Sequence, residues 1–467
     1  MTDMPSGPTS PPPTRIDDAA RKIDDVLHRA ARSVRRALVW NRIYRTTSYL
    51  RSALWTIPLL AILLVLILAP GLRVLDTWLG WRLSGLGISG AQALYQTTIT
   101  LTLSFVVFTF GSLLVAIQVA GGQLTPRIIA TTLLRDNVVR YSVGLFVFTL
   151  VFAVMALNRL DKTVYEIVSL ITALLAIACM AMFLFLIDYA ARLLRPVSIL
   201  TRVGDEGAKV IMAVYREPAS AAPEVEKPFA APEGRSRTVP HTGPSAIILA
   251  VDLDTLVADA QRKGGLIELV PQVGDFVATG EPLLELYGNA VSLSNYRVQS
   301  AVALGPERTL EQDPLFAFRI IADIGLKALS PAINDPTTGV LAIDQLHRLL
   351  RVVGRRRLRS ETIADGTGAP RLIFRTPNWE DYVSVACTEI RGCGAGNVQI
   401  ARRMRAMLDN LIATLPARRH AALDSERRRL NAAIATLYPI DDDRALASIP
   451  DRQGLGGSSA LRTPGRV

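Results

Sequence analysis

Four long runs of apolar residues lie within the first two hundred positions of the chain. They cover residues 53–72, 97–117, 141–157 and 165–189. The hydrocarbon core of a bilayer is about 30 Å thick and is crossed by about 20 helical residues, so each run reaches or approaches the length of a transmembrane helix. We therefore predict a four-helix transmembrane domain over residues 51–195.

The segment before the first run has two parts. Residues 1–14 hold prolines among serine and threonine, with too few apolar groups to form a core, and are predicted to be disordered. Over residues 15–50, apolar positions recur at spacings of three and four between Ile16 and Leu38, which predicts an amphipathic basic helix in the cytoplasm. Two interpretations stay open: this helix lies on anionic lipid headgroups, or it packs against a neighbouring subunit.

Beyond the apolar runs, the pattern is that of an α+β region. Prolines recur through residues 216–245, which predicts a flexible linker or a long insertion. Short β-rich runs over 246–300 predict a small β domain, amphipathic patterns over 301–440 predict a helical domain, and 441–467 are predicted to be a mobile tail. The expected fold class is an α-helical membrane domain of four transmembrane helices plus a cytoplasmic α+β domain with a small β-barrel-like part and C-terminal helices.

One short phrase is the basis for expecting a barrel-like part. The sequence Gly-Asp-Phe-Val at 274–277, followed by Gly280, is similar to the turn of small barrel-sandwich domains such as lipoyl carriers. Those carriers need a lysine at a hairpin tip, and no lysine lies between Lys263 and Lys327. We therefore expect a tight turn that glycine permits, without a prosthetic group.

The distribution of basic residues predicts the orientation of the spans. Half of all residues are hydrophobic, the formal net charge is +11 and the mean hydropathy is +0.29. Arginines and lysines are dense before the first span, whereas only Arg73 and Arg82 lie between the first two spans. Because basic residues stay on the cytoplasmic side, we predict a multi-pass protein of the bacterial inner membrane with both termini in the cytoplasm.

The residue types that carry most enzyme and metal chemistry are scattered. The three cysteines form no Cys-x-x-Cys pair, and the four histidines show no metal-ligand spacing. No nucleophile is spaced with a base, and no phosphate-binding loop is present. The sequence therefore predicts no enzyme activity, no metal and no cofactor.

The second apolar run carries hydroxyl and small residues on one side. Thr97, Thr100, Ser104, Gly111 and Gln118 form one stripe along the helix. In one interpretation the stripe lines the lumen of an oligomeric pore. In the other, it packs helices closely through small and hydroxyl residues. The interiors of all four runs lack ionisable side chains, which disfavours a proton-driven transporter.

A pair of glycines marks the end of the second run. Gly121-Gly122 is predicted to break the helix, after which Thr125 is an N-cap and Pro126 the first residue of a short cytoplasmic helix. The candidate site residues of this turn are Gln123, Thr125, Pro126 and Arg127.

A set of polar residues accompanies a predicted helix break further along the chain. In one interpretation they cluster to hold a cation, an anion or a neighbouring subunit. In the other, Asn334 and Asp335 satisfy backbone groups and the rest are solvated. The set comprises Asp313, Arg319, Asp323, Asn334 and Asp335.

A run of arginines follows this set. It is either a solvated face or a surface for phosphate or lipid headgroups, and the lack of interleaved aromatic residues disfavours nucleic acid. The run comprises Arg351, Arg355, Arg356, Arg357 and Arg359.

Two phrases are specific enough to indicate a family. They are Gly-Gln-Leu-Thr-Pro-Arg at 122–127 and Leu-Ser-Pro-Ala-Ile-Asn-Asp-Pro at 329–336. From about Ser52 to Tyr438 the chain resembles the bacterial predicted membrane proteins of domain of unknown function 2254. The resemblance implies residence in a lipid bilayer, and the family has no assigned activity.

Two functional hypotheses from different classes follow. The first is an oligomeric inner-membrane pore or ion-conducting protein whose cytoplasmic domain assembles or gates it. Four apolar spans are too few to enclose a polar lumen, so the channel hypothesis requires a homo-oligomer. The alternative is a membrane-anchored scaffold or sensor whose cytoplasmic domain binds a protein or small ligand.

Overall fold

The computed structural model describes residues 55–79, 85–123, 136–160, 164–193, 195–219, 234–358 and 362–457. The predicted segments 1–14 and 15–50 lie outside these stretches. The contacts between residues divide the chain into two units, which are described separately. Within the described stretches, the first unit contains 234–308 and 362–375, and the second contains the rest.

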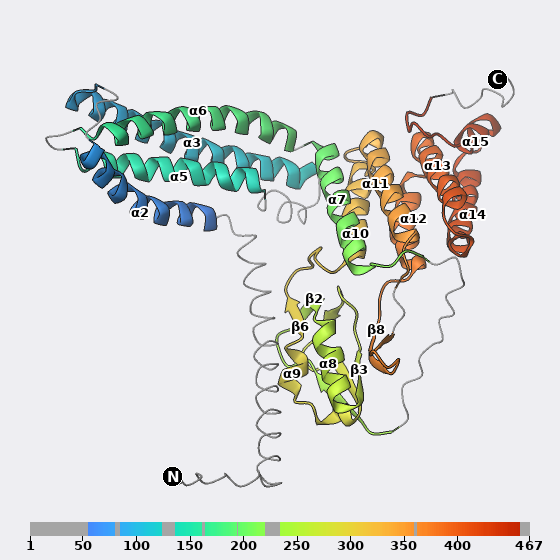
Figure 1. The fold of residues 1–467 in the computed structure, drawn as a ribbon. Helices are drawn as coiled ribbons and strands as arrows, with labels where there is room; N and C mark the ends of the chain where they lie inside the picture. The colour runs from blue at the N-terminus through green and yellow to red at the C-terminus, as the bar shows by residue number, and fades with distance from the viewer. Residues whose placement is uncertain are drawn as a thin grey trace, which may run out of the picture. The chain divides into compact units, whose positions relative to one another are not determined.

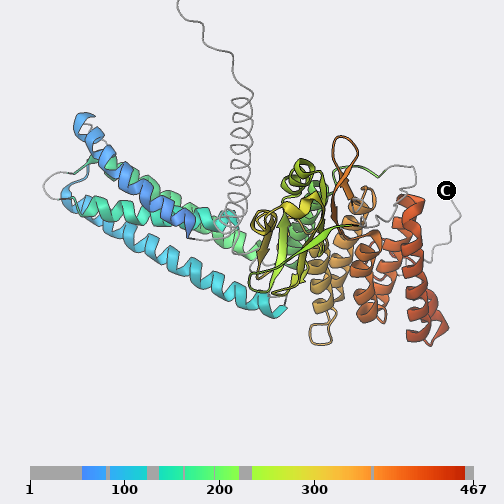
Figure 2. The same cartoon turned by 90° about the horizontal axis from the view of Figure 1, so that it is seen from below.

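Four apolar helices belong to the second unit and run alongside one another (Figures 1 and 2). We call α2, α3, α5 and α6 the apolar bundle. Each is long and apolar enough to cross a membrane, which confirms the four predicted spans at this level. Their bounds are Thr56–Leu79 for α2, Ile88–Gln123 for α3, Asn137–Leu157 for α5 and Glu166–Leu193 for α6.

The helices of the apolar bundle extend beyond the predicted spans. Helix α3 begins at Ile88 because Ala91 and Tyr95 are buried against other helices of the bundle, and it continues through Gly121 and Gly122. A glycine costs only about 1 kcal/mol in a helix, and the helix does not break at this pair as predicted. Beyond the predicted spans, the helices take in the ionisable residues Arg73, Asp76, Arg140 and Arg192, while Glu166 and Asp188 lie just inside the two ends of the fourth predicted span.

Helix α5 is the central helix of the apolar bundle. Half of its apolar window is buried, against 12%, 22% and 17% for α2, α3 and α6. Phe146 and Phe152 of α5 are fully enclosed, in contact clusters with residues of the other helices. The remaining helices therefore present much of their surface outward.

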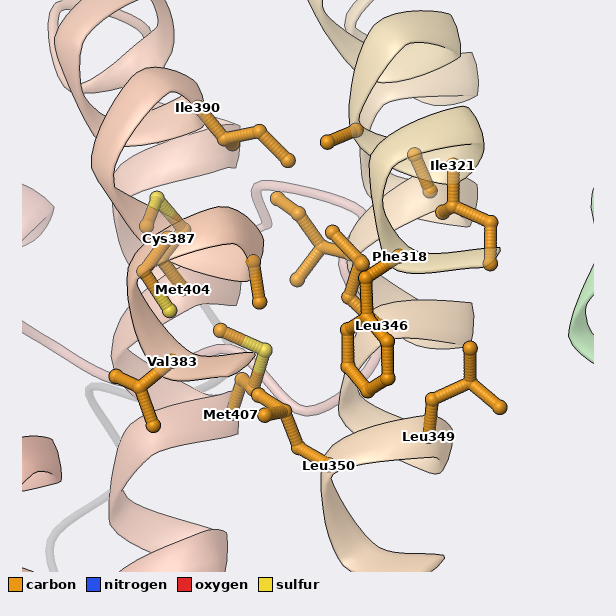
Figure 3. Close-up of a cluster of buried hydrophobic side chains, with 14 of the residues drawn as sticks. Phe318, Ile321, Leu346, Leu349, Leu350, Val383, Cys387, Ile390, Met404 and Met407 are labelled. Atoms are coloured by element: carbon orange, nitrogen blue, oxygen red, sulfur yellow. The ribbon is translucent and has the colours of Figure 1, made fainter. Parts of the chain in front are cut away.

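Seven further helices of the second unit form what we call the helical domain. Its core is one large apolar cluster, part of which is shown in Figure 3, with Phe318, Leu346, Val383 and Met407 among its members. The helices are α7 (Pro196–Val214), α10 (Pro314–Ala328), α11 (Pro336–Gly354), α12 (Trp379–Gly394), α13 (Val398–Thr414), α14 (His420–Leu437) and α15 (Asp441–Ala447).

The β domain, which is the described part of the first unit, contains two open sheets. The larger has the order β1-β5-β3-β8-β7 and the smaller β4-β2-β6. The strands are β1 (Ser236–Pro240), β2 (Ala246–Val251), β3 (Gly265–Leu269), β4 (Phe276–Val277), β5 (Pro282–Gly288), β6 (Val302–Gly305), β7 (Thr362–Ala364) and β8 (Pro370–Phe374). Helices α8 (Leu253–Lys263) and α9 (Asn295–Gln299) accompany them.

The barrel-like part predicted from the turn motif is not supported, because neither described sheet closes on itself. The turn itself has the expected backbone: Gly274 and Gly280 have φ of 93° and 91°, which glycine adopts without strain. The domain also extends beyond 246–300, since β8 pairs in parallel with β3 and aligns Leu372 with Ile267. A local turn motif contains no information about such a distant strand.

The segment from Asp441 to Gly457, predicted as part of a mobile tail, is held by a buried arginine. The side chain of Arg402 is 1% exposed and donates hydrogen bonds to the carbonyls of Ile449 (3.1 Å), Gly456 (3.0 Å) and Gly457 (2.8 Å). The Asp451 carboxylate accepts from the amide of Gly456 at 2.7 Å. These bonds tie the segment to α13.

Replacing Arg402 by methionine is expected to release this segment. A hydrogen bond to a charged group contributes about 1.5–3 kcal/mol, so trypsin should cut after the exposed Arg452 at least about ten times faster. Mass spectrometry of the digested full-length protein measures this rate. The matched control is Arg428→Met at an exposed position of α14, and equal cleavage in both variants would contradict the proposed anchoring role.

Candidate functional site

The polar stripe predicted on α3 lies on the outside of the apolar bundle. All five of its residues, Thr97, Thr100, Ser104, Gly111 and Gln118, are exposed. The other threonines of the helix, which are Thr98, Thr102 and Thr109, are buried. Packing thus separates the hydroxyl residues into an inward set that contacts the bundle and an outward set that is free for another surface.

The outward hydroxyls are compatible with an apolar surrounding and with water. Thr100 donates to the carbonyl of Gln96 at 3.0 Å, and Ser104 donates to that of Thr100 at 2.8 Å. Each donor is therefore satisfied within the helix, while the oxygen lone pairs still face outward. A Cβ atom at Gly111 would contact nothing within 4 Å, so the stripe is open there.

The end of α3 is packed against the helical domain. Leu113 and Ile117 are partly buried on its apolar core, as is Leu193 at the end of α6. A movement of the helical domain would consequently act on α3 within one or two turns of Gln118.

A second connection between the two regions is a buried carboxylate, Asp136, which caps α5. One of its oxygens accepts from the amides of Val138 (2.8 Å) and Val139 (3.2 Å). The other accepts from the Tyr189 hydroxyl (2.7 Å) and the Arg202 guanidinium (2.5 Å). We call Asp136, Tyr189 and Arg202 the junction, because they come from α5, α6 and α7.

The electrostatics of the junction favour the charged form of Asp136. Burial by itself would raise the pKa of this carboxyl, but the hydrogen bonds from Tyr189 and Arg202, with the Arg202 charge, lower the pKa below its ordinary value of 3.8. Sequence reasoning did not select Asp136, although an aspartate directly before an apolar helix is a readable N-cap signal. Its two long-range partners carry no such signal.

The turn residues predicted after the second span are only partly described. Gln123 is the last residue of α3. Thr125, Pro126 and Arg127 lie outside the described stretches, and so does Arg359.

The five polar residues predicted near the helix break are not gathered into one cluster. Asp313 caps the start of α10, accepting from the Phe316 amide at 3.0 Å, whereas Asp335 caps α11 and accepts from the Thr338 amide at 3.1 Å. The 15 residues of α10 separate these two caps by about 22 Å.

The other members of the set have partners of their own. Arg319 pairs with Asp323 at 2.7 Å and with Glu389, and Asn334 has a left-handed backbone with φ of 51° in the turn before α11. In the part of the chain that the structure describes, no three His, Cys, Asp or Glu residues are grouped as metal ligands. Among the described residues, the set thus forms two helix caps, an ion-paired arginine and a turn at separate places.

The chain has a bundle of four helices that are long and apolar enough to cross a membrane, together with a helical domain and a β domain. These features are those of an integral membrane protein. The chain belongs to the family described as predicted membrane protein (DUF2254), whose model matches residues 51–410. This confirms the family indicated by the two sequence phrases.

Relatives of the chain occur in mycobacteria. The uncharacterized proteins Rv1290c of Mycobacterium tuberculosis and Mb1321c of Mycobacterium bovis are each 25% identical to it over 450 residues. The match covers 93% of this chain and 84% of each relative. No solved structure matches the chain.

Proposed function

We propose that the protein is a homo-oligomeric, ion-conducting protein of the bacterial inner membrane, in which the polar stripe of α3 faces the shared axis. The observation that carries the proposal is the exposure of all five stripe residues on a helix whose other exposed side chains between Thr97 and Val115 are apolar, apart from Ser112. Thr97, Thr100 and Ser104 lie within the predicted span, and the lone pairs of their hydroxyl oxygens, which lipid cannot satisfy, favour water or a polar neighbour. Gln118 lies one residue beyond that span.

Several copies are required because packed side chains fill the centre of one subunit. The centre of the apolar bundle is filled by side chains such as Val65, Phe146 and Phe152. A lumen must therefore form between subunits, and α3 presents the polar surface for it. Both termini, the helical domain and the β domain would then lie in the cytoplasm, in keeping with the distribution of basic residues.

The helical domain is suited to gate such a pore. Leu113 and Ile117 attach it to the end of α3, and the junction attaches α7 to α5 and α6. A ligand or partner that shifts the helical domain would thus displace the helix that carries the stripe.

The triple variant Thr97→Leu, Ser104→Leu and Gln118→Leu is expected to abolish conductance without dispersing the oligomer. Leucine at these positions makes the lumen apolar, and a narrow apolar pore excludes water. The measurement is single-channel recording in planar bilayers bathed in KCl, with native mass spectrometry of the detergent-solubilised protein for its stoichiometry. Phe110→Leu, an exposed change on another face of α3, should conduct as the unchanged protein does.

Two results would contradict the pore. One is a monomeric mass for the unchanged protein, which would favour the membrane-anchored sensor. The other is an undiminished conductance of the triple variant.

A further inference from the structure

A cleft of about 740 Å³ in the helical domain is lined mainly by basic side chains. It lies along the last turns of α11, and its other wall is formed by Met212 of α7 and by Pro218. The polar residues that line it are Asp344, His347, Arg348, Arg351, Arg355 and Arg356. None of them belongs to the stripe or to the junction.

The positive charge of the cleft is not balanced by nearby carboxylates. Asp344 accepts from the Arg403 guanidinium at 2.6 Å, and Arg348 pairs with Asp205 at 2.5 Å. Arg351, Arg355 and Arg356 form no ion pair with any residue that the structure describes. Three positive charges are thus left facing one concave surface.

The usual preference of a helix C-terminus for positive charge does not explain why three arginines gather near the end of α11. The negative end of the α11 dipole, equivalent to about half a charge, favours one nearby cation. Arg351 and Arg355 are four residues apart on the same face, where like charges repel by a few tenths of a kcal/mol. A bound anion would convert this repulsion into attraction.

His347 lines the cleft and is held by two neighbouring side chains. Its Nε2 lies 2.9 Å from the Asn410 side-chain oxygen, and its Nδ1 lies 3.2 Å from an Arg403 nitrogen. Burial, together with the charges of Arg403 and Arg351, lowers the pKa of His347, while Asn410 and Asp344 oppose this. The ring is therefore neutral at pH 7 and serves as a wall, which leaves the arginines as the anion ligands.

We infer that this cleft binds a small molecule carrying one or more phosphate groups, with Arg351 and Arg355 as its principal ligands. Guanidinium groups match phosphate oxygens in bidentate pairs. A volume of about 740 Å³ exceeds that of a single phosphate and lies in the roughly 300–1,000 Å³ range of ligand pockets. The inference does not depend on the proposed pore.

The test is a titration of the full-length, detergent-solubilised protein with sodium pyrophosphate in an isothermal calorimeter. The double variant Arg351→Gln, Arg355→Gln should bind at least about tenfold more weakly, because it loses charge-assisted hydrogen bonds. Arg428→Gln, the matched control on an exposed face of α14, should bind as the unchanged protein does. A lysine pair at 351 and 355 should retain part of the affinity, since it keeps the charge but not the bidentate geometry.

A second arm identifies the source of the phosphate. Native mass spectrometry with dioctanoyl phosphatidic acid, against dioctanoyl phosphatidylcholine, shows whether a lipid headgroup is retained. Binding of pyrophosphate, or of phosphatidic acid alone, supports the inference when the double variant loses it. The inference is overturned if the unchanged protein binds neither probe, or if the double variant binds no more weakly than the Arg428→Gln control.

Discussion

Replacing Asp136 by alanine is expected to lower the free energy of unfolding by about 3 kcal/mol. The change removes an N-cap, which contributes about 1 kcal/mol, and leaves the partly buried Tyr189 hydroxyl without its acceptor at about 1–3 kcal/mol. The ion pair adds little more, because Arg202 is 41% exposed and water can replace its partner. Scanning fluorimetry of the full-length protein in detergent measures the loss.

Two controls separate the parts of this effect. Asp136→Asn keeps an oxygen that accepts from the Val138 amide but removes the charge, so it should cost less than alanine. Tyr189→Phe removes only the hydroxyl. If Asp136→Ala were no less stable than Tyr189→Phe, the carboxylate would not hold the junction.

The same carboxylate gives the junction a defined pH dependence. The pKa of Asp136 in the folded protein is lower than the ordinary value of 3.8, which applies when the chain is unfolded. Its contribution is therefore fully present above that value and is lost as the pH falls toward the lower folded-state pKa. Between pH 7 and about pH 4, the free energy of unfolding should change with pH equally in the Asp136→Asn variant and in the unchanged protein. At lower pH, the free energies of unfolding of the two proteins should converge.

The apolar bundle illustrates how much of a membrane region a sequence can predict. Length and composition suffice to locate the spans, since few other structures contain such long apolar runs. Their ends depend on packing, as the burial of Ala91 and Tyr95 shows for α3. Periodicity likewise placed hydroxyl residues on one arc, but only neighbouring helices determine that Thr98 is buried and Thr97 exposed.

The junction and the arginine-lined cleft also depend on contacts between residues that are far apart in the sequence. Asp136 is recognisable as a cap, but its partner Arg202 is 66 residues away. The arginines of α11 are visible in the sequence, whereas the concave surface they line needs Met212 and Pro218 of an earlier segment. The β domain depends on the pairing of β3 with β8, which no local motif encodes.

Replacing Trp379 by alanine is expected to destabilise the helical domain by about 3–5 kcal/mol, the range for deleting a large buried aromatic side chain. Trp379 is 2% exposed at the start of α12 and fits against Gly354, where an added Cβ would lie 3.3 Å from the ring. Its indole nitrogen donates to the Arg419 carbonyl at 2.9 Å, and the Arg419 guanidinium lies 5.4 Å from the ring centre. Thermal unfolding of the full-length protein measures the loss.

The Trp379→Phe variant tests whether volume or hydrogen bonding dominates. Phenylalanine keeps most of the apolar contact and loses the indole donor, so its cost should be about 1–3 kcal/mol, the penalty of one unsatisfied buried carbonyl. The effect should extend to the basic cleft, because Arg419 also donates to the Arg356 carbonyl at 3.1 Å and so helps to position that wall. Trp379→Ala should therefore weaken pyrophosphate binding under conditions where the variant is still folded. Unchanged stability in the alanine variant would mean that Trp379 is not part of the helical core.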